Sequence, residues 1–480
     1  MVKLQKSTAC ALLLCLLVPN LSRAQNGKAY TLEACIDIAL KNNSEFKNAV
    51  YRVNSAGATV KGSYSRILPQ ITSTFQSGRT IRGTTVNTQN IPVTDIITVV
   101  DTDGGERTFG ATRIDAATKQ PVVDFVEIVS PTSFRWGHQV TLRYNQTLYD
   151  FGRSWNAIRQ AKASYEASSQ SLTSARQNVF ATVKQRYLEL LKAQRLEQEF
   201  MEAVERSKEE LNRTQSMYEI GSVAQIDVYR QEVTLGTDEI NLINQQNTVK
   251  IAQGNLNVAM GRDPEEPLQV LEIEPNFAPP SFSLTEAYKV AEANNPELIR
   301  FQYDMESAEY GRKVAKGNFW PSIGISATYS RDNQNLDRVY GSLGENYALT
   351  LGASVSFNIF NGFSDVAELG RESANYSIAQ ENWIDQKRRL QLQVKQAYLN
   401  LEGFSRIAKI NETRLRSAEE EYRLAQERYR VGAGTQLEVT EAQVSLTRAR
   451  VQLVSSKYDA LIAQAQLEAA MGTIDKDKGN

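Results

Sequence analysis

The chain contains 480 residues, of which 41% are hydrophobic, and 54 basic residues balance 55 acidic residues to give a net charge of −1. This hydrophobic fraction is too low for a bundle of membrane-spanning helices. A nearly neutral chain has no overall field that would attract nucleic acid or an anionic membrane surface, and we expect no nucleic-acid partner.

The N-terminus predicts a secretory signal peptide. Lys3 and Lys6 form a positive start, residues 9–18 form an apolar core, and Ser22-Arg23-Ala24 provides small residues for cleavage. A membrane anchor needs about 20 apolar residues, and this apolar run is shorter. We therefore expect residues 1–24 to be a signal peptide cleaved after Ala24.

Two of the three cysteines, Cys10 and Cys15, lie in this signal peptide. Neither suits lipidation, because Cys10 precedes most of the apolar core and Cys15 follows Leu14, where a small residue is expected. Cys35 alone remains after cleavage, so no intrachain disulfide is possible. It lies in a helix-like run, and we expect it to be a buried small hydrophobic residue.

Two helices are predicted before Pro69. Beyond this proline the spacing of apolar residues changes from helical to alternating, which predicts strands at about 69–77 and 138–150. The residues between these strands, about 78–137, contain further β-prone runs and turn signals. We expect this insertion to form an extended hairpin or loop.

The longest uninterrupted pattern runs from Ser154 to Ile220, where 67 consecutive residues include no glycine or proline. A continuous helix of that length extends about 100 Å, far more than a compact domain needs. Its apolar residues step by three, four and three positions, as in a coiled-coil seam: Phe180, Val183, Tyr187 and Leu190. We predict a long helix at about 153–220, a turn capped by Gly221, and a return helix at 225–260.

Both halves of the chain carry the same pattern. The segment 183–190 reappears as 394–401, and residues 30–69 match residues 282–321 without a gap. Such self-similarity predicts a duplicated helix–strand–strand–long helix–helix unit. The predicted organisation is a first repeat at 25–261, a proline-rich linker at 262–281, a second repeat at 282–472 and a disordered tail at 473–480.

In the second repeat the predicted elements are strands at about 321–331 and 347–360, a long helix at about 363–431 and a return helix at 436–471. The polar faces of the strands are rich in serine, threonine and glycine, which suits a wet lumen or a crowded barrel interior. Aromatic residues flank the strands as an interfacial belt would: Trp136, Trp155, Trp320, Tyr149, Phe360 and Phe363. A soluble, half-buried sheet has the same alternation and stays an alternative.

The sequence offers no candidate for catalysis. Its single histidine, His138, stands at a strand start, where a structural or surface role is expected. No thiol cluster, set of histidine and carboxylate ligands, phosphate-binding glycine loop or nucleophile motif is present. We therefore expect neither an enzyme nor a cofactor or metal site.

The number of strands sets a condition on membrane insertion. Four strands cannot close a barrel, since about eight is the practical minimum, and open edges are not tolerated in lipid. If the strands enter a membrane, several chains must share one barrel. The long helices would then continue that barrel as an α-helical cylinder, and the assembly would form a tunnel.

In the order and repetition of its motifs, the chain resembles the TolC-like outer-membrane efflux protein family. The shared features are the signal peptide, the duplicated unit, a Leu-Pro or Trp-Pro pair before the first strand, Tyr-x-x-Gly at the helix turns and Ala-Met-Gly at the ends of the return helices. The resemblance departs mainly at 78–137, which would be an extracellular loop. It implies a mainly α fold with membrane β-strands: a homotrimer whose twelve-stranded outer-membrane β-barrel is continued by a periplasmic α-helical barrel.

The same resemblance implies the passive exit duct of a tripartite efflux pump or type I secretion system. The partners would be outer-membrane lipid, a periplasmic adaptor (membrane fusion) protein and an inner-membrane transporter of the RND or ABC type. The adaptor would dock at the helix turns, on residues Tyr218, Gly221, Ser222, Tyr429, Gly432 and Ala433. A competing interpretation is a non-conducting periplasmic coiled-coil protein that bridges membranes, which explains the long helices but not the alternating strands.

The resemblance also implies candidate residues for a periplasmic gate. Asp227 and Tyr429 match members of the network that links the coiled coils, and Glu438 and Glu441 stand where the family has rings of carboxylates. The arginine partner of that network falls on Gly434, so a latch must use other groups, such as a hydrogen bond between Tyr429 and Asp227. Engagement by the adaptor would loosen the coiled coils there. The alternative is that these carboxylates are ordinary solvated helix residues.

Overall fold

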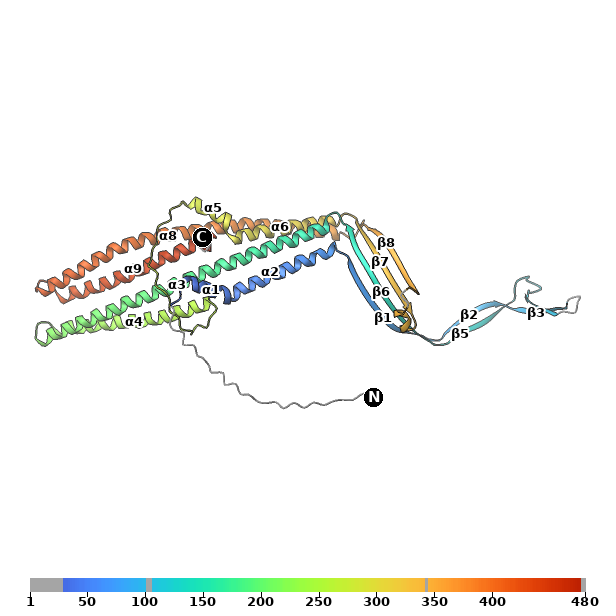
Figure 1. Cartoon of the computed structure of the whole chain (residues 1–480), viewed down its shortest axis with the longest axis horizontal. Helices are drawn as coiled ribbons and strands as arrows, with labels where there is room; N and C mark the ends of the chain where they lie inside the picture. Colours follow the sequence, from blue (N-terminus) through green and yellow to red (C-terminus); the bar gives the residue numbers. More distant parts are fainter. Residues whose placement is uncertain (1–28, 101–105, 342–343, 476–480) are drawn as a thin grey trace, which may run out of the picture. The chain divides into compact units, whose positions relative to one another are not determined.

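Figure 1 shows the computed structural model of the chain, which describes residues 29–100, 106–341 and 344–475. The predicted signal peptide therefore lies outside the described residues. None of the helices in these ranges combines the length and the apolar composition that crossing a membrane would require.

The chain forms two compact units. The first contains the residues up to Gly57, Ala163–Glu306 and the residues from Ser377, and the second contains Ala58–Lys162 and Ser307–Tyr376. The helices are α1 (Leu32–Asn42), α2 (Ser44–Ser63), α3 (Arg153–Glu219), α4 (Gln225–Ala259), α5 (Leu284–Asn294), α6 (Pro296–Gly317), α7 (Leu336–Tyr340), α8 (Ser364–Arg430) and α9 (Gln436–Ala470), with a short 3-10 turn at Tyr64–Arg66.

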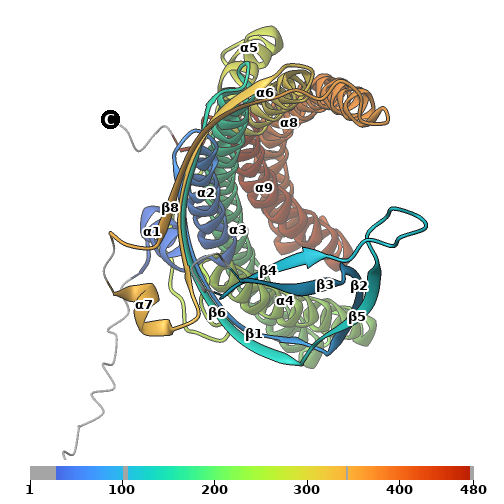
Figure 2. The same ribbon diagram turned by 90° about the vertical axis from the view of Figure 1, so that its right-hand side faces the viewer.

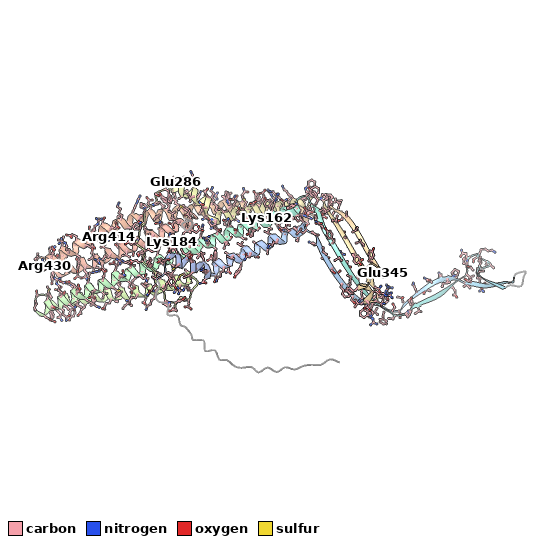
Figure 3. The ribbon with its side chains drawn as sticks, viewed as in Figure 1. Lys162, Lys184, Glu286, Glu345, Arg414 and Arg430 are labelled. Atoms are coloured by element: carbon pink, nitrogen blue, oxygen red, sulfur yellow. The ribbon has the colours of Figure 1, made fainter. Side chains whose placement is uncertain are left out.

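The two long helices, α3 and α8, each contain 67 residues, and each is followed by a return helix of 35 residues. Ion pairs join α3 to the return helix α9. Lys184, labelled in Figure 3, has its Nζ atom 2.6 Å from Glu468 Oε2, and Lys192 Nζ lies 2.8 Å from Asp459 Oδ1. Two large apolar clusters pack the first unit: one joins α1, α3, α4 and α9, and the other joins α5, α8 and α9.

An apolar cluster forms where α1 packs against α3, α4 and α9. Its members include Cys35, Val183, Tyr187, Leu190, Leu256, Met260, Tyr458 and Ile474. The Tyr187 hydroxyl reaches the carbonyl oxygens of Leu271, at 2.6 Å, and Tyr30, at 3.1 Å, which ties the linker to α3. Desolvation raises the pKa of Tyr187 to about 12.

Cys35 is fully buried in the apolar cluster, so its predicted role as a small hydrophobic residue is confirmed. Burial raises the pKa of its thiol to about 11.

The prediction of a disordered tail from residue 473 is wrong at its start, because Ile474 is buried in the same cluster and Asp475 Oδ1 accepts a hydrogen bond from Gln177 Nε2 at 3.1 Å. Residues 476–480 lie outside the described residues.

The ends of both return helices meet the turn between two short helices in the same way. Asn43 Nδ2 donates to the carbonyl oxygen of Ala259 at 3.4 Å, and Asn295 Nδ2 donates to that of Ala470 at 3.2 Å. The next glycines, Gly261 and Gly472, have φ near +70°. A Cβ atom on Gly472 would lie 2.5 Å from the backbone of the facing turn, so only glycine fits.

The second unit is built on a four-stranded antiparallel sheet in the order β1-β6-β7-β8. Its strands are β1 (Gln70–Arg82), β6 (Ser133–Tyr149), β7 (Ser322–Asn333) and β8 (Tyr347–Ser356). The inserted segment continues β1 and β6 as two further ladders, in which β2 (Thr85–Pro92) pairs with β5 (Val123–Ser130) and β3 (Thr94–Val100) pairs with β4 (Glu106–Thr112).

Three strand boundaries differ from those expected. The strands expected at about 69–77 and 138–150 extend further, because Gly78 pairs with Gly137 and the ladder continues to Arg82 and Ser133. A matched glycine pair keeps its backbone hydrogen bonds, so it does not end an antiparallel ladder. The strand expected at 347–360 stops at Ser356, because its partner β7 begins only at Ser322, directly after a proline.

The strands of the sheet alternate between an apolar and a polar face. On β1 and β6 the apolar face carries Ile71 and Phe75 opposite Tyr144 and Val140. Figure 2 shows that the sheet is curved and that α7 lies on its convex side. The ring of Tyr340 of α7 lies near that of Phe75, with the ring centroids 6.0 Å apart and the planes tilted by 40°, so the apolar face is the convex one.

Candidate functional site

The two helix turns that were predicted to dock an adaptor share one backbone geometry. In the first turn (residues 220–224), Gly221 N–H and Ser222 N–H donate to the carbonyl oxygens of Tyr218 and Met217, both at 2.8 Å. In the second turn (residues 431–435), Gly432 and Ala433 make the equivalent bonds. Gly221 and Gly432 have φ of 77° and 75°, the left-handed cap that favours glycine. Both turns are exposed, so their side chains are accessible.

The turns differ in how the return helix is capped. Thr435 Oγ1 accepts the Glu438 N–H at 3.3 Å at the start of α9, whereas Ala224 has no side chain that could cap α4. An N-cap of this kind contributes about 1 kcal/mol to helix stability. The start of α9 is therefore better fixed than the start of α4.

The candidate gate residue Tyr429 connects α8 to α3. Its hydroxyl donates to Met217 Sδ at 3.4 Å, and the Arg213 guanidinium lies 5.3 Å above its ring. Burial raises the pKa of Tyr429; Arg213 opposes this shift, and Glu210 and Asp227 add to it. Tyr429 is thus a contact between two helices and not a solvated surface residue.

Asp227 lies near Tyr429 but is paired elsewhere. Its Oδ1 is 3.3 Å from Arg230 Nη1, one turn further along α4. Within one chain, Tyr429 and Asp227 make these two separate contacts instead of the suggested hydrogen bond with each other. Burial is the main cause of the raised pKa of Tyr429, and the charge of Asp227 is a minor contribution in the same direction.

Glu438 has an arginine partner that the sequence comparison did not anticipate. Arg428 Nη1 lies 3.2 Å from Glu438 Oε2, and Arg428 Nη2 donates to the Ala433 carbonyl oxygen at 3.0 Å. Gly434 makes room for this arrangement, because a Cβ atom there would lie 3.1 Å from Arg428 Cβ and 3.3 Å from Glu438 Oε2. The glycine at the position of the expected arginine thus allows a different arginine to close the turn.

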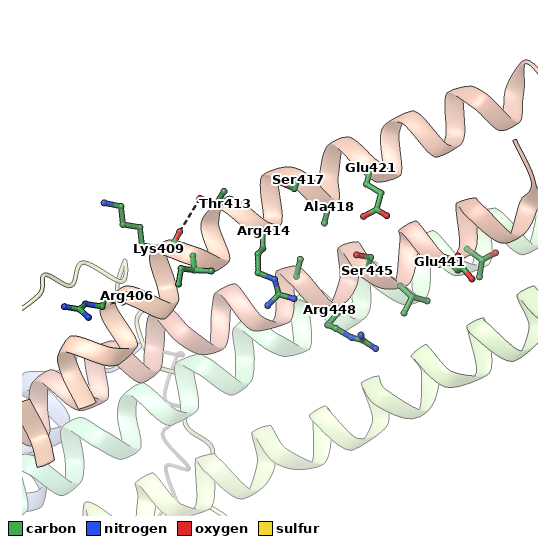
Figure 4. A pocket seen from close by; sticks show the side chains of 14 residues that line it. Arg406, Lys409, Thr413, Arg414, Ser417, Ala418, Glu421, Glu441, Ser445 and Arg448 are labelled. Carbon is green, nitrogen blue, oxygen red and sulfur yellow. Dashed lines mark hydrogen bonds between the residues drawn. The ribbon is translucent and has the colours of Figure 1, made fainter. Parts of the chain in front are cut away.

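Glu441 lies in a groove of about 1000 Å³ between α8 and α9 (Figure 4). The groove has an apolar part formed by residues that include Ile410 and Val444. Four cationic side chains and two carboxylates line it: Arg406, Lys409, Arg414, Arg448, Glu421 and Glu441. The groove therefore combines an apolar part with an excess of positive charge.

A buried polar cluster between α3, α4 and α9 was missed by the sequence analysis. It consists of Ser207, Glu210, Gln231, Gln436 and Gln443, of which Ser207 and Gln231 are 0% exposed and Gln443 is 1% exposed. Gln443 Nε2 donates to Ser207 Oγ at 2.9 Å, and Gln436 Nε2 donates to Glu210 Oε1 at 2.9 Å. The positions 436, 439, 443 and 446 follow a coiled-coil seam, so glutamine at alternate seam positions was the available signal.

Arg450 of α9 links three helices just beyond this polar cluster. Its Nη1 lies 2.7 Å from Glu202 Oε2 and 3.9 Å from Glu199 Oε2 of α3, and its Nη2 lies 4.0 Å from Glu419 Oε1 of α8. Burial, followed by the charge of Glu202, raises the pKa of Glu199, and Arg450 opposes the shift. Charge pairs and buried amides therefore join the helices between this level and the turns, alongside buried apolar residues such as Val439 and Leu446.

Long paired helices and an amphipathic antiparallel sheet on one chain also form the fold of solved outer-membrane channel proteins. A family model described as outer membrane efflux protein matches residues 109–262 and 287–473. The chain belongs to this outer membrane efflux protein family, a family of channel proteins and not of enzymes, and its location is the outer membrane.

Individual relatives are distant. The chain is 22% identical over 241 residues to the outer membrane efflux protein BepC of Brucella suis biovar 1. This match covers 50% of the chain and 51% of BepC. The chain thus spans about half the length of this curated relative. The crystal structure of the outer membrane protein VceC from Vibrio cholerae has a TM-score of 0.71 at 16% identity, covering 92% of this chain and 96% of VceC. The Campylobacter jejuni CmeC outer membrane channel has a TM-score of 0.73 at 18% identity, covering 92% of this chain and 85% of CmeC. At these identities the likeness concerns the fold.

Proposed function

We propose that this protein is the passive exit duct of a tripartite efflux pump or type I secretion system. The observation that carries the proposal is a four-stranded sheet whose apolar face is exposed and whose edge strands, β1 and β8, each pair on one side only. Unpaired edges are not tolerated in lipid, so the edges need partners from other copies of the chain. Three copies would supply a twelve-stranded barrel, and their long helices would form the periplasmic tunnel.

The proposal includes a duplicated unit in each chain. Equivalent contacts support it: the helix turns at Gly221 and Gly432, and the amide bonds of Asn43 and Asn295 to the ends of α4 and α9. With two such units per chain, a homotrimer places six similar helix pairs around one axis. That arrangement is what a closed helical cylinder needs.

The gate in this proposal is the part of the helical unit from the polar cluster to the two helix turns. An apolar cluster loses buried area when helices separate, whereas amides and carboxylates exchange their partners for water at a small net cost. The polar cluster, with Asp227, Tyr429, Glu438 and Glu441 near the turns, is therefore the part that opens. A periplasmic adaptor would bind the exposed turns and the groove beside α8 and α9, and an inner-membrane transporter would supply the energy.

Planar-bilayer recordings of the purified protein test the proposal. The wild-type protein should form trimers that need detergent and should show small, discrete conductance steps. Asp227→Ala combined with Tyr429→Phe should increase the conductance, because it removes the charge near Tyr429 and the hydroxyl bond to Met217. Unchanged conductance in the double variant would refute the gate, while a soluble, non-conducting particle would favour the alternative of a periplasmic bridging protein.

A further inference from the structure

A cationic and aromatic hollow lies at the end of β1 and β6 nearest the inserted hairpin. Its volume is about 850 Å³, and its lining includes Arg79, Arg338, Trp136 and His138. Arg79 and Arg338 line this hollow on the face of Trp136, while Arg135 and Asp332, the sole acidic lining residue, lie on the opposite face of the sheet. The excess of positive charge suits an anionic group.

Arg79 is held on the apolar, convex face of the sheet. It shares that face with Ile71 and Phe75, because the three alternate along β1, and its partner across the ladder is Trp136. The guanidinium lies 4.6 Å from the centroid of the Phe134 ring and 6.0 Å from that of Trp136. Cation–π contacts orient an arginine but leave its N–H groups free to donate to an anion.

The neighbouring groups complete a polar site beside the aromatic rings. His138 stacks on Trp136 with ring centroids 5.9 Å apart, and its Nδ1 lies 2.8 Å from Ser77 Oγ. Arg338 comes from α7, which lies on the convex face (Figure 2). None of the ion pairs found within the described ranges involves Arg79 or Arg338. Leu336 and Trp136 line an adjoining hollow of about 450 Å³ together with polar residues that include Asp337, so two apolar side chains and one carboxylate lie beside the arginines.

The depth of the site matches the edge of a membrane. Arg79 follows Ile71 by eight positions on β1, which corresponds to about 26 Å along a strand. Because barrel strands are tilted, the distance from Ile71 to Arg79 is about 20 Å along the membrane normal. The apolar band of an outer-membrane barrel has a similar height of about 25 Å. Trp136 has the position of an interfacial aromatic residue. The arginines therefore lie at headgroup level, beside the ends of lipid chains.

We infer that this hollow binds a phosphate group of a lipid headgroup in the leaflet nearest the inserted hairpin. The inference rests on the proposed function, because it requires the apolar face of the sheet to be in a membrane. Arg79 and Arg338 supply charge-assisted donors for the phosphate oxygens, and Trp136 with Leu336 contacts the adjoining apolar part of the lipid. The bound lipid would fix the height of the sheet in the membrane.

Native mass spectrometry of the full-length protein from lipid nanodiscs tests the site. Nanodiscs of phosphatidylcholine are prepared with and without lipid A, a glycolipid with two phosphate groups, or its dephosphorylated form. Wild-type protein should retain lipid A and not the dephosphorylated form. Arg79→Gln with Arg338→Gln should reduce retention about tenfold, the change expected when charged hydrogen bonds are lost. Arg82→Gln, which removes an arginine from the other face of β1, should have no effect.

Three results would overturn the inference. They are equal retention by the double variant, retention of the dephosphorylated form, and displacement of lipid A by inorganic phosphate alone, which would indicate a site for free anions. Flotation with phosphatidylcholine vesicles is measured on each protein in parallel. Failure of the wild type to float would contradict the membrane placement and with it the proposed function, whereas flotation without lipid A retention would contradict only the lipid site.

Discussion

The apolar cluster around Tyr187 and the polar cluster around Gln443 are two ways of packing the same helices. Near α1, the helices α3, α4 and α9 bury Val183, Leu190 and Leu256. Nearer the helix turns, the same three helices bury Ser207, Gln231 and Gln443 at similarly low exposure. Depth of burial is therefore equal in the two regions, and what differs is the chemistry of the buried side chains.

This difference separates stability from the ability to rearrange. Removing apolar area from contact costs about 25 cal/mol per Å², with no compensation from water. Separating hydrogen-bonded amides costs much less, because water replaces each lost partner. The polar cluster is also incompletely satisfied, since Oε1 of Gln231, of Gln436 and of Gln443 has no partner within the described structure. We therefore expect the apolar cluster to hold the unit together and the polar cluster to permit motion.

Leu190→Ala tests the stabilising half of the comparison and should have the largest effect. Leu190 is fully buried, so the truncation leaves a cavity and should lower the free energy of unfolding by about 3 kcal/mol. Chemical denaturation of the detergent-solubilised protein measures the change. Bilayer conductance of the folded fraction should stay unchanged, because the cavity is far along α3 from the helix turns.

Leu190→Met serves as the matched variant for that experiment. It keeps the volume of the side chain and should cost less than about 1.5 kcal/mol. If both substitutions were equally harmless, the apolar cluster would not be the stabilising region, and the contrast with the polar cluster would fail.

Gln443→Leu converts one position of the polar cluster to apolar packing. Ser207 Oγ loses the Gln443 donor but still donates to Asp238 Oδ2 at 2.5 Å, so only one bond is lost. Since the buried, unpartnered Oε1 atom is also removed, we expect the free energy of unfolding to rise by about 1 kcal/mol. Conductance should fall, because the helices separate less easily.

The same substitution at Gln246, an exposed glutamine of α4, is the control and should change neither quantity. A destabilised Gln443→Leu protein with higher conductance would reverse the comparison. In that case the polar cluster would hold the helices together and would not permit their motion.

Sequence periodicity predicted the apolar cluster more readily than the polar one. Phe180, Val183, Tyr187 and Leu190 mark a seam because apolar spacing is what such patterns detect. In the sequence, a buried glutamine such as Gln231 cannot be told from a solvated one, because its burial depends on α9 lying opposite.

The Arg428–Glu438 contact could not be predicted either, since it depends on the backbone of the second helix turn and on the space left by Gly434. Alternation predicted the strands, but the ladder through Gly78 and Gly137 depended on pairing and not on side chains.

Glu199 lies on α3 between the two clusters and gives the comparison a pH dependence. It is 8% exposed, and burial with the nearby Glu202 raises its pKa. A carboxyl with a higher pKa in the folded protein binds its proton more strongly there, so the free energy of unfolding decreases as pH rises from about 4.3 through the folded pKa. Glu199→Gln should flatten this decrease and raise Tm at pH 7. Thermal unfolding between pH 4 and pH 8 measures it, and the exposed Glu205→Gln serves as control. A lower Tm for Glu199→Gln would mean that the 3.9 Å contact with Arg450 outweighs burial.

Arg428→Gln should have the smallest effect, because it removes a contact at the surface of the second helix turn. The side chains of Arg428 and Glu438 are 59% and 40% exposed, and such pairs contribute about 0.2–1 kcal/mol. A double-mutant cycle with Glu438→Gln should give a coupling energy of about 0.5 kcal/mol in low salt, and 1 M salt should remove most of it by screening. Gly434→Ala should reduce the coupling too, since its Cβ atom would lie 3.1 Å from that of Arg428. A coupling energy that persists in high salt would show that packing around Gly434, and not the charges of Arg428 and Glu438, holds the turn. The buried polar cluster would then be the sole polar contribution to gating.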